Sequence, residues 1–160
     1  MDIYILYIIL FNYKIMLKIY IYIIIQNMFK KLYKLITLNY SPDIIFDIGA
    51  HKGEWTRGCL NIFPLAYYYL YDPTYYDEIN NYNRFYNVKF YNVLLYEKDD
   101  MVPWYENKST GDSIFKENTK HYNDIIPYMR QAISLGTHIK NNNINYYNKK
   151  ILIKLDTQGS

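Results

Sequence analysis

A chain of 160 residues has room for one domain, and its content of 51% hydrophobic and 19% aromatic residues favours a packed globule over disorder. The net charge of +3 is uneven, since residues 1–40 carry +4 and residues 41–160 carry −1. A near-neutral domain lacks the basic surface that nucleic-acid binding needs. The single cysteine, Cys59, excludes an internal disulfide and a multi-cysteine metal site. From the charge and the cysteine count together, neither nucleic acid nor metal is an expected partner.

The first 40 residues form an apolar and basic segment that differs from the rest of the chain. Residues 3–25 are almost entirely Ile, Leu, Tyr and Phe, with Lys14 and Lys18 near the middle. This length could cross a bilayer, but each lysine costs about 2.5–3.5 kcal/mol there, which nearly cancels the gain from the apolar residues. Membrane insertion is therefore predicted to be marginal.

Three interpretations of this segment stay open. It is a membrane anchor or surface helix, a helix packed on the domain, or sequence upstream of a later start at Met28 or Met16. In the anchor interpretation the lysines around residues 30–34 mark the cytoplasmic flank, by the positive-inside rule. The remaining domain, residues 41–160, is expected in the cytoplasm, with or without membrane association.

The stretch Asp43–Gly53 predicts a strand, a glycine turn and the start of a helix. Ile44–Ile48 is a short continuous apolar run of the kind found in strands buried on both faces. Gly49 and Gly53 follow, and an apolar stripe at helical spacing continues to Phe63. In α/β sheets this arrangement binds nucleotide-like ligands at the carboxyl end of the strand.

Later segments alternate between strand and helix patterns, which predicts a parallel α/β sheet. The expected strands are Ala66–Tyr71, Val88–Leu95, a hairpin strand Val102–Glu106, and Ile151–Leu155. The expected helices are Gly53–Phe63, Tyr75–Arg84 and Ile125–Leu135.

Three of the expected parallel strands end in or are followed by a carboxylate: Asp47, Asp72 and Asp156. The carboxyl ends of parallel strands meet at one edge of the sheet, so we expect these side chains to face one crevice. Asp72 lies 23 residues after Gly49, close to the spacing at which an acidic residue accepts hydrogen bonds from ribose hydroxyls.

The glycine pattern discriminates between cofactors. Asp47 to Gly53 reads Asp-x-Gly-x-x-x-Gly, without the third glycine of the dinucleotide fingerprint, and no P-loop motif is present. A carboxylate at the strand end would repel a pyrophosphate and suits a ligand with a cationic amino-acid portion, such as S-adenosylmethionine. A nicotinamide-dependent enzyme is the weaker alternative.

The order of segments resembles the FkbM-type methyltransferase family over residues 41–160. Asp43–Gly53 is similar to its first motif, Tyr71–Pro73 to its second-strand end, Val88–Tyr96 to its third strand, Ser109–Phe115 to its serine-containing loop, and Ile153–Gly159 to its fourth-strand motif. Asp72 replaces the family's usual glutamate, and Leu135–His138 stands where Thr-Leu-Asp is common.

The resemblance implies a Rossmann-like class I methyltransferase sheet with strand order 3-2-1-4-5-7-6. The chain covers only the N-terminal half of that sheet, strands one to four plus a hairpin insertion, and so resembles a C-terminally truncated member. The strand 151–155 would then be an exposed edge open to self-association.

The implied activity is S-adenosylmethionine-dependent methyl transfer, usually to an oxygen of a small-molecule or carbohydrate acceptor. The implied cofactor-binding residues are Asp47, Gly49, Ala50, His51, Gly53, Asp72, Asn92 and Val93. Asp156 is the implied catalytic residue on the acceptor side. His121 and His138 are expected on the surface. The methyltransferase domain is expected to be inactive as this fragment. The alternative is a degenerate, non-catalytic interaction module, with or without membrane attachment.

Overall fold

The computed structural model describes residues 29–107 and 111–157. Its main element is a parallel sheet of four strands in the order β3-β2-β1-β7. The strands are β1 (Ile44–Ile48), β2 (Tyr67–Tyr71), β3 (Val88–Tyr91) and β7 (Ile151–Leu155). The α/β class is as the sequence predicts, the order of these four strands is the one that the resemblance implies, and the sheet is compatible with a Rossmann-like fold.

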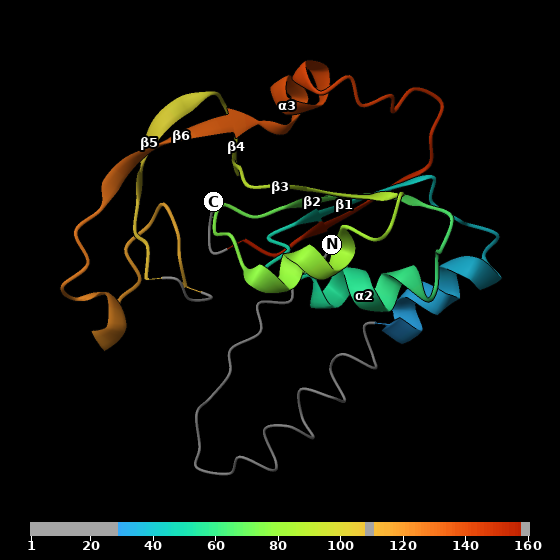
Figure 1. The fold of residues 1–160 in the computed structure, drawn as a ribbon, viewed down its shortest axis with the longest axis horizontal. Coiled ribbons are helices and arrows are strands. Elements are labelled where there is room, and N and C mark those ends of the chain that lie inside the picture. The colour runs from blue at the N-terminus through green and yellow to red at the C-terminus, as the bar shows by residue number, and fades with distance from the viewer. Residues whose placement is uncertain (1–28, 108–110, 158–160) are drawn as a thin grey trace, which may run out of the picture.

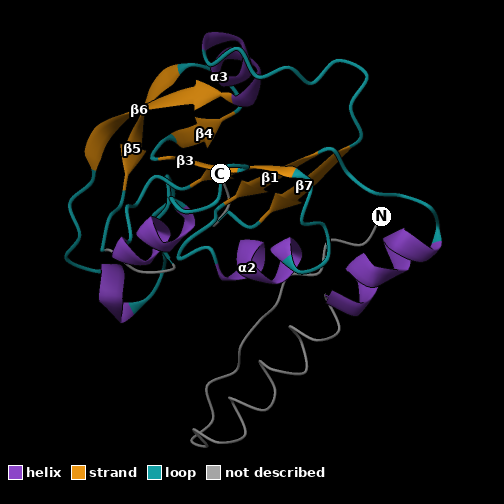
Figure 2. Ribbon diagram, turned by 45° about the vertical axis from the view of Figure 1, so that its right-hand side comes forward, coloured by secondary structure: helices purple, strands orange, loops and turns teal. Residues whose placement is uncertain are grey.

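Helices cover both faces of this sheet (Figures 1 and 2). One face carries α2 (Glu54–Leu60), the 3-10 helix η1 (Asp77–Tyr82) and the helical residues 29–37, and the other carries α3 (Leu135–Asn141). Strand β1 is buried along its whole length and alternates between the two cores. Ile45 packs towards Cys59 of α2, whereas Phe46 packs with Ile144 beyond α3.

The expected helix Gly53–Phe63 is shorter in the structure, because α2 ends at Leu60, but the predicted apolar stripe is buried. Cys59, Ile62 and Phe63 are buried in the core beneath the sheet, and Trp55 packs against the same core. Residues 29–37 belong to this core as well, because Leu32 is buried there. The expected boundary at residue 40 therefore falls after a helix that already packs on the domain.

Burial of Cys59 has a chemical consequence. The thiol has no exposed surface, and burial, followed by the charge of Asp47, raises its pKa far above the usual range. Because the thiolate is the reactive form, we expect Cys59 to resist iodoacetamide at pH 8 in the native protein and to react in urea. Mass spectrometry of the intact chain measures this, and rapid native alkylation would contradict the buried position.

A second, three-stranded sheet stands beside the end of the first. It contains β4 (Leu94–Tyr96), β5 (Asp100–Trp104) and β6 (Tyr128–Ser134) in the order β4-β6-β5. The predicted third strand is thus interrupted at Asn92, whose side-chain amide donates to the carbonyl oxygens of Asp72 and Pro73 at 3.0 and 2.8 Å.

Two predictions in this region are wrong. Residues 125–135 are not a helix, because most of them form β6, which pairs with β4 on one side and β5 on the other. The predicted hairpin strand forms as β5, but it pairs with the distant β6 instead of the strand before it. Both errors have one cause: pairing over a long sequence separation outweighs local preference.

Helix α3 begins directly after β6, where the Ser134 hydroxyl accepts from the Thr137 amide at 3.1 Å. This helix carries His138, which is only 6% exposed and not on the surface as expected. The ring lies edge-on to Tyr91 and Tyr71, with centroids 4.4 and 5.2 Å apart, because those tyrosines form the sheet face below α3. His121 is exposed, as predicted.

The predicted helix Tyr75–Arg84 shortens to the six-residue 3-10 helix η1. Asn is a weak helix former, and three of the four residues 80–83 are Asn, so the segment has too few good helix formers to extend the helix.

Strand β7 pairs with β1 alone among the described residues, so its outer edge is open as expected. Ile153 and Leu155 are 49% and 71% exposed there. Self-association through this edge stays a prediction. The apolar segment 3–25 lies outside the described residues. Within residues 29–107 and 111–157, no helix has the length and apolarity that crossing a membrane requires.

Candidate functional site

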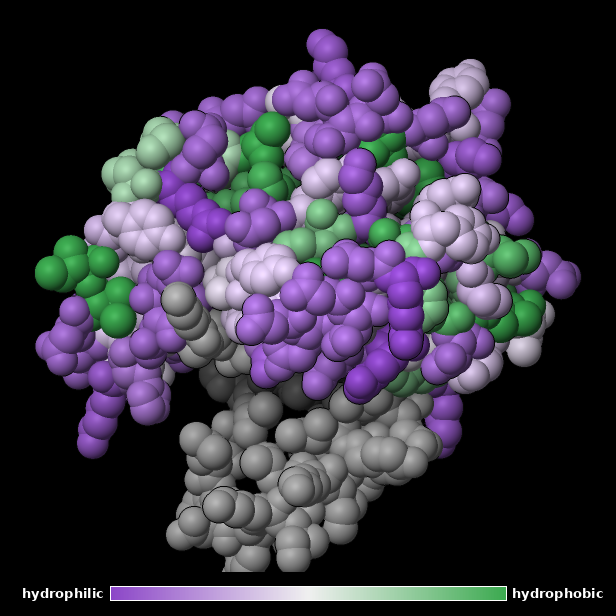
Figure 3. Space-filling view, in the orientation of Figure 1, coloured by the Kyte–Doolittle hydropathy of each residue, from purple (hydrophilic) through white to green (hydrophobic). Residues whose placement is uncertain are grey.

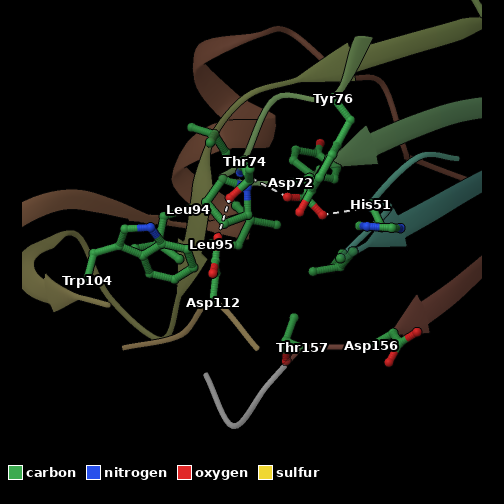
Figure 4. A pocket seen from close by; sticks show the side chains of 15 residues that line it. His51, Asp72, Thr74, Tyr76, Leu94, Leu95, Trp104, Asp112, Asp156 and Thr157 are labelled. Atoms are coloured by element: carbon green, nitrogen blue, oxygen red, sulfur yellow. Dashed lines mark hydrogen bonds between the residues drawn. The ribbon is translucent and has the colours of Figure 1, made fainter. Parts of the chain in front are cut away.

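A cavity of about 190 Å³ opens at the carboxyl ends of β1, β2 and β7, and the second sheet supplies its other wall (Figure 4). Five residues expected from the sequence line it: Gly49, His51, Asp72, Val93 and Asp156. Four others do not: Asp47, Ala50, Gly53 and Asn92.

Asp72 directly follows β2, lines the cavity and is 8% exposed. One carboxylate oxygen accepts from the His51 amide at 2.7 Å and the other from the Thr74 amide at 2.9 Å. Burial raises the pKa of Asp72, and the two amide hydrogen bonds oppose that rise. Each oxygen keeps a further lone pair, so the carboxylate can also accept from a ligand.

The loop Gly49–Gly53 turns sharply between β1 and α2. Gly49, His51 and Gly53 all have positive φ values of 74°, 50° and 76°. For His51 this conformation costs about 1–2 kcal/mol, and the bond from its amide to Asp72 helps to hold it. Its ring stands edge-on to Tyr76 at a centroid distance of 4.4 Å, which fixes both rings at the cavity wall.

The space left by each of these glycines is filled by the protein itself. A Cβ on Gly49 would lie 2.0 Å from the carbonyl oxygen of Asp156, at the end of β7. A Cβ on Gly53 would lie 2.5 Å from the ring of Tyr82, whose hydroxyl donates to the Gly53 carbonyl. The two glycines therefore allow close packing of the loop against β7 and η1.

This packing predicts a large effect of Gly49→Ala. The substitution combines a left-handed φ with a backbone clash, so we expect a loss of about 2–5 kcal/mol of unfolding free energy, measured by urea denaturation. Gly136→Ala on α3 is the matched control, because nothing lies within 4 Å of the added Cβ, and it should be neutral or slightly stabilising. Equal effects of the two substitutions would contradict the close approach of β7.

Asp47 points away from the cavity, towards α2, and is fully buried. It accepts from the Thr56 hydroxyl at 2.6 Å and lies 3.0 Å from the Lys154 ammonium. That ammonium also donates to the Gly49 carbonyl at 2.7 Å and lies 3.4 Å from Asp156. Lys154 thus joins the ends of β1 and β7 to the turn between them.

The expectation that three carboxylates meet in one crevice holds for two of them. Asp72 and Asp156 line the cavity, whereas Asp47 lies beneath its floor. Burial raises the pKa of Asp47, and Lys154 and Thr56 act against this rise. Asp156 lies at the rim with its side chain 74% exposed, and its carboxylate turns away from Asp72 (Figure 4).

The second sheet and the loop between β5 and β6 contribute residues that were not expected at the site from the sequence. Leu94, Leu95 and Trp104 form an apolar wall, and Asp112 adds a third carboxylate to the cavity. Asp112 accepts from the hydroxyls of Thr74 and Tyr122 at 3.2 and 2.8 Å. Leu94, Leu95 and Asp112 fall within segments that resemble family motifs, but their place at the cavity depends on how the second sheet and the β5–β6 loop pack beside the first sheet.

The cavity is acidic. Asp72, Asp112 and Asp156 line it, and no lysine or arginine does so among the described residues. Such a surface disfavours phosphate groups and favours cations and hydroxyl donors. Within the described part of the chain, no cluster of His, Cys, Asp or Glu has the arrangement of a metal site.

No family model matches this chain, and neither a curated protein nor a solved structure is found to be similar to it. The fold and site define an α/β protein with an acidic cavity at the carboxyl edge of a parallel sheet.

Proposed function

We propose that this chain binds S-adenosylmethionine and carries the cofactor side of an FkbM-type methyltransferase, acting on an oxygen of a small-molecule or carbohydrate acceptor. The observation that carries the proposal is the acidic cavity at the carboxyl edge of the sheet. S-adenosylmethionine brings a sulfonium and an ammonium group and no phosphate, which suits the carboxylates of Asp72 and Asp112, while Asp156 at the rim is paired with Lys154.

Asp72 supports this proposal by position. It follows β2, is held by two amides, and would accept hydrogen bonds from the ribose hydroxyls. Asn92 is committed to the Asp72 and Pro73 carbonyls and would act by holding the loop, not by touching the adenine. Val93 and the apolar wall would contact the base.

Methyl transfer is an in-line displacement, and alignment of donor and acceptor supplies much of its acceleration. When bound, S-adenosylmethionine supplies the methyl group on its sulfonium. Asp156, at the rim, would face the acceptor and accept its hydroxyl proton. This role for Asp156 requires its exposed carboxylate to turn towards the cavity.

A second candidate is a module that binds the cofactor without turnover. The observation that favours it is the cavity volume of about 190 Å³, below the roughly 300–1,000 Å³ of ordinary ligand sites. The described residues would then enclose only part of the ligand. Cofactor binding with no methyl transfer to any hydroxyl acceptor tested would support this candidate.

The proposal is tested by calorimetric titration of the full chain with S-adenosylmethionine and, separately, with NAD⁺. We expect binding of the first and none of the second, because a pyrophosphate would meet Asp72, Asp112 and Asp156. Binding of NAD⁺ with equal or greater affinity would overturn the proposal.

The affinity should also depend on pH. Hydrogen bonds from ribose hydroxyls need an ionised Asp72, and burial raises the pKa of this group above its ordinary value of 3.8. We therefore expect affinity to fall on acidification at a pH above 3.8, where an exposed aspartate would still be ionised. Affinity that stays constant down to that pH would contradict contact with Asp72.

A further inference from the structure

A second hollow of opposite character lies on the face of the molecule that carries α2 and η1. This α2–η1 groove has a volume of about 640 Å³, within the range of small-molecule sites. Its lining includes Arg57 from α2 and Tyr82 from η1. The segment that follows η1 adds Arg84, Phe85 and Tyr86. Hydrophilic side chains gather over these elements in the lower centre of Figure 3.

The charges in the groove leave two guanidinium groups available. Lys52 and Glu78 neutralise each other, with 2.7 Å between the ammonium and the carboxylate. Within the described ranges, neither Arg57 nor Arg84 forms a salt bridge. Glu54 is the one further acidic residue in the lining, so the groove keeps a net positive charge.

Aromatic side chains of the groove contact one of the two arginines and lie beside the other in its lining. The Arg84 guanidinium lies over the ring of Phe85, 4.9 Å from its centroid. Tyr82 is anchored by the bond from its hydroxyl to the Gly53 carbonyl. Burial raises the pKa of Tyr82, and the positive charges of Arg57 and Arg84 both act against that rise. Arg57, Arg84 and Tyr82 line the same groove.

We propose that the α2–η1 groove binds a phosphate monoester carried on an aromatic body. Arg57 and Arg84 would hold the phosphate, since guanidinium groups suit its oxygens geometrically. Phe85 and Tyr86, the latter 83% exposed, would contact the ring. The carboxylates of the acidic cavity would repel the same phosphate, so the two sites would bind ligands of opposite charge. The inference about the groove does not depend on the proposed function.

The test is a titration of the full, ¹⁵N-labelled chain with phenyl phosphate at low ionic strength, followed by NMR of the arginine Nε–H groups. We expect the Arg57 and Arg84 signals to shift and saturate, with affinity about tenfold lower in Arg57→Gln and in Arg84→Gln. Lys140→Gln removes an exposed cation from α3 on the opposite face and should leave the affinity unchanged.

Three further measurements decide the chemistry. Benzyl alcohol has the ring without the charge and should not saturate these signals, while inorganic phosphate should bind more weakly than phenyl phosphate. Saturating S-adenosylmethionine should not displace phenyl phosphate, which distinguishes this groove from the acidic cavity. Equal affinity of both arginine variants and the wild type, or equal shifts with benzyl alcohol, would overturn the proposal. The spectra of the variants also report whether the fold is retained.

Discussion

Replacing Lys154 by methionine is expected to destabilise the protein by about 3–5 kcal/mol at neutral pH, because it leaves the fully buried Asp47 without its cation. Lys154 is itself only 15% exposed and also donates to the Gly49 carbonyl. The side chain of methionine is of similar length, so the loss would reflect charge and hydrogen bonding more than volume.

The effect should depend on pH in a defined direction. Lys154 lowers the pKa of Asp47, which burial raises, so the ion pair contributes only where Asp47 is ionised. Well below pH 3.8, Asp47 is protonated in both the unfolded and the folded chain, and the part of the cost that comes from the ion pair should disappear. As the pH rises, Asp47 ionises freely in the unfolded chain, but in the folded variant burial without Lys154 opposes its ionisation. The loss of unfolding free energy in the variant should therefore grow with pH.

Urea denaturation of wild type and variant at both pH values measures this difference. Lys140→Met, an exposed lysine of α3, is the matched control and should change stability by less than about 1 kcal/mol. Asp47→Asn combined with Lys154→Met removes both charges and should recover part of the loss. A cost that is the same at acid and neutral pH would contradict an ion pair with Asp47.

Replacing Asp72 by alanine is expected to weaken binding of S-adenosylmethionine by about 100-fold or more. Two hydrogen bonds from hydroxyls to a charged acceptor contribute about 1.5–3 kcal/mol each. The substitution also leaves the amides of His51 and Thr74 without their acceptor and releases the turn that lines the cavity. The fold should therefore lose about 1–3 kcal/mol per amide that stays buried.

Calorimetric titration gives the affinity, and urea denaturation gives the stability of the same sample. Asp124→Ala is the matched control, because Asp124 is exposed in the loop before β6 and away from the cavity. Asp72→Asn keeps one acceptor oxygen and should fall between wild type and alanine in both measurements. Cofactor affinity unchanged in Asp72→Ala, with the fold intact, would remove Asp72 from the proposed site.

The sequence predicts the part of the fold in which local pattern and tertiary role agree. Ile44–Ile48 and Ile151–Leu155 are short apolar runs, and both are strands with the predicted bounds. The stripe containing Cys59 is a helix face in the core. The short apolar run alone marks both strands: β1 is buried along its whole length, while Ile153 and Leu155 of β7 stay 49% and 71% exposed.

Residues 125–135 show why the rest could not be predicted. Their pattern allowed a helix, and only pairing with β4 and β5 makes them a strand. Trp104 of β5 and Asp112 of the loop between β5 and β6 line the cavity, so part of its wall depends on contacts between segments distant in the sequence.

The predicted site residues divide for a related reason. Gly49 and Gly53 mark the turn correctly, but the space beside them is taken by Asp156 and Tyr82. Asp47 ends its strand as predicted, yet the alternation of β1 directs it towards α2 and Lys154. Spacing along the chain locates a strand end, whereas the face on which a side chain lies depends on strand register.

The most direct test of the central claim is NMR of the ¹⁵N-labelled full chain during titration with S-adenosylmethionine. The account predicts saturable shifts of the His51 and Thr74 amides, which both donate to Asp72, with no comparable shift of the Arg57 and Arg84 side chains in the α2–η1 groove. Saturable shifts confined to that groove, or none at any residue, would contradict binding of S-adenosylmethionine at the acidic cavity.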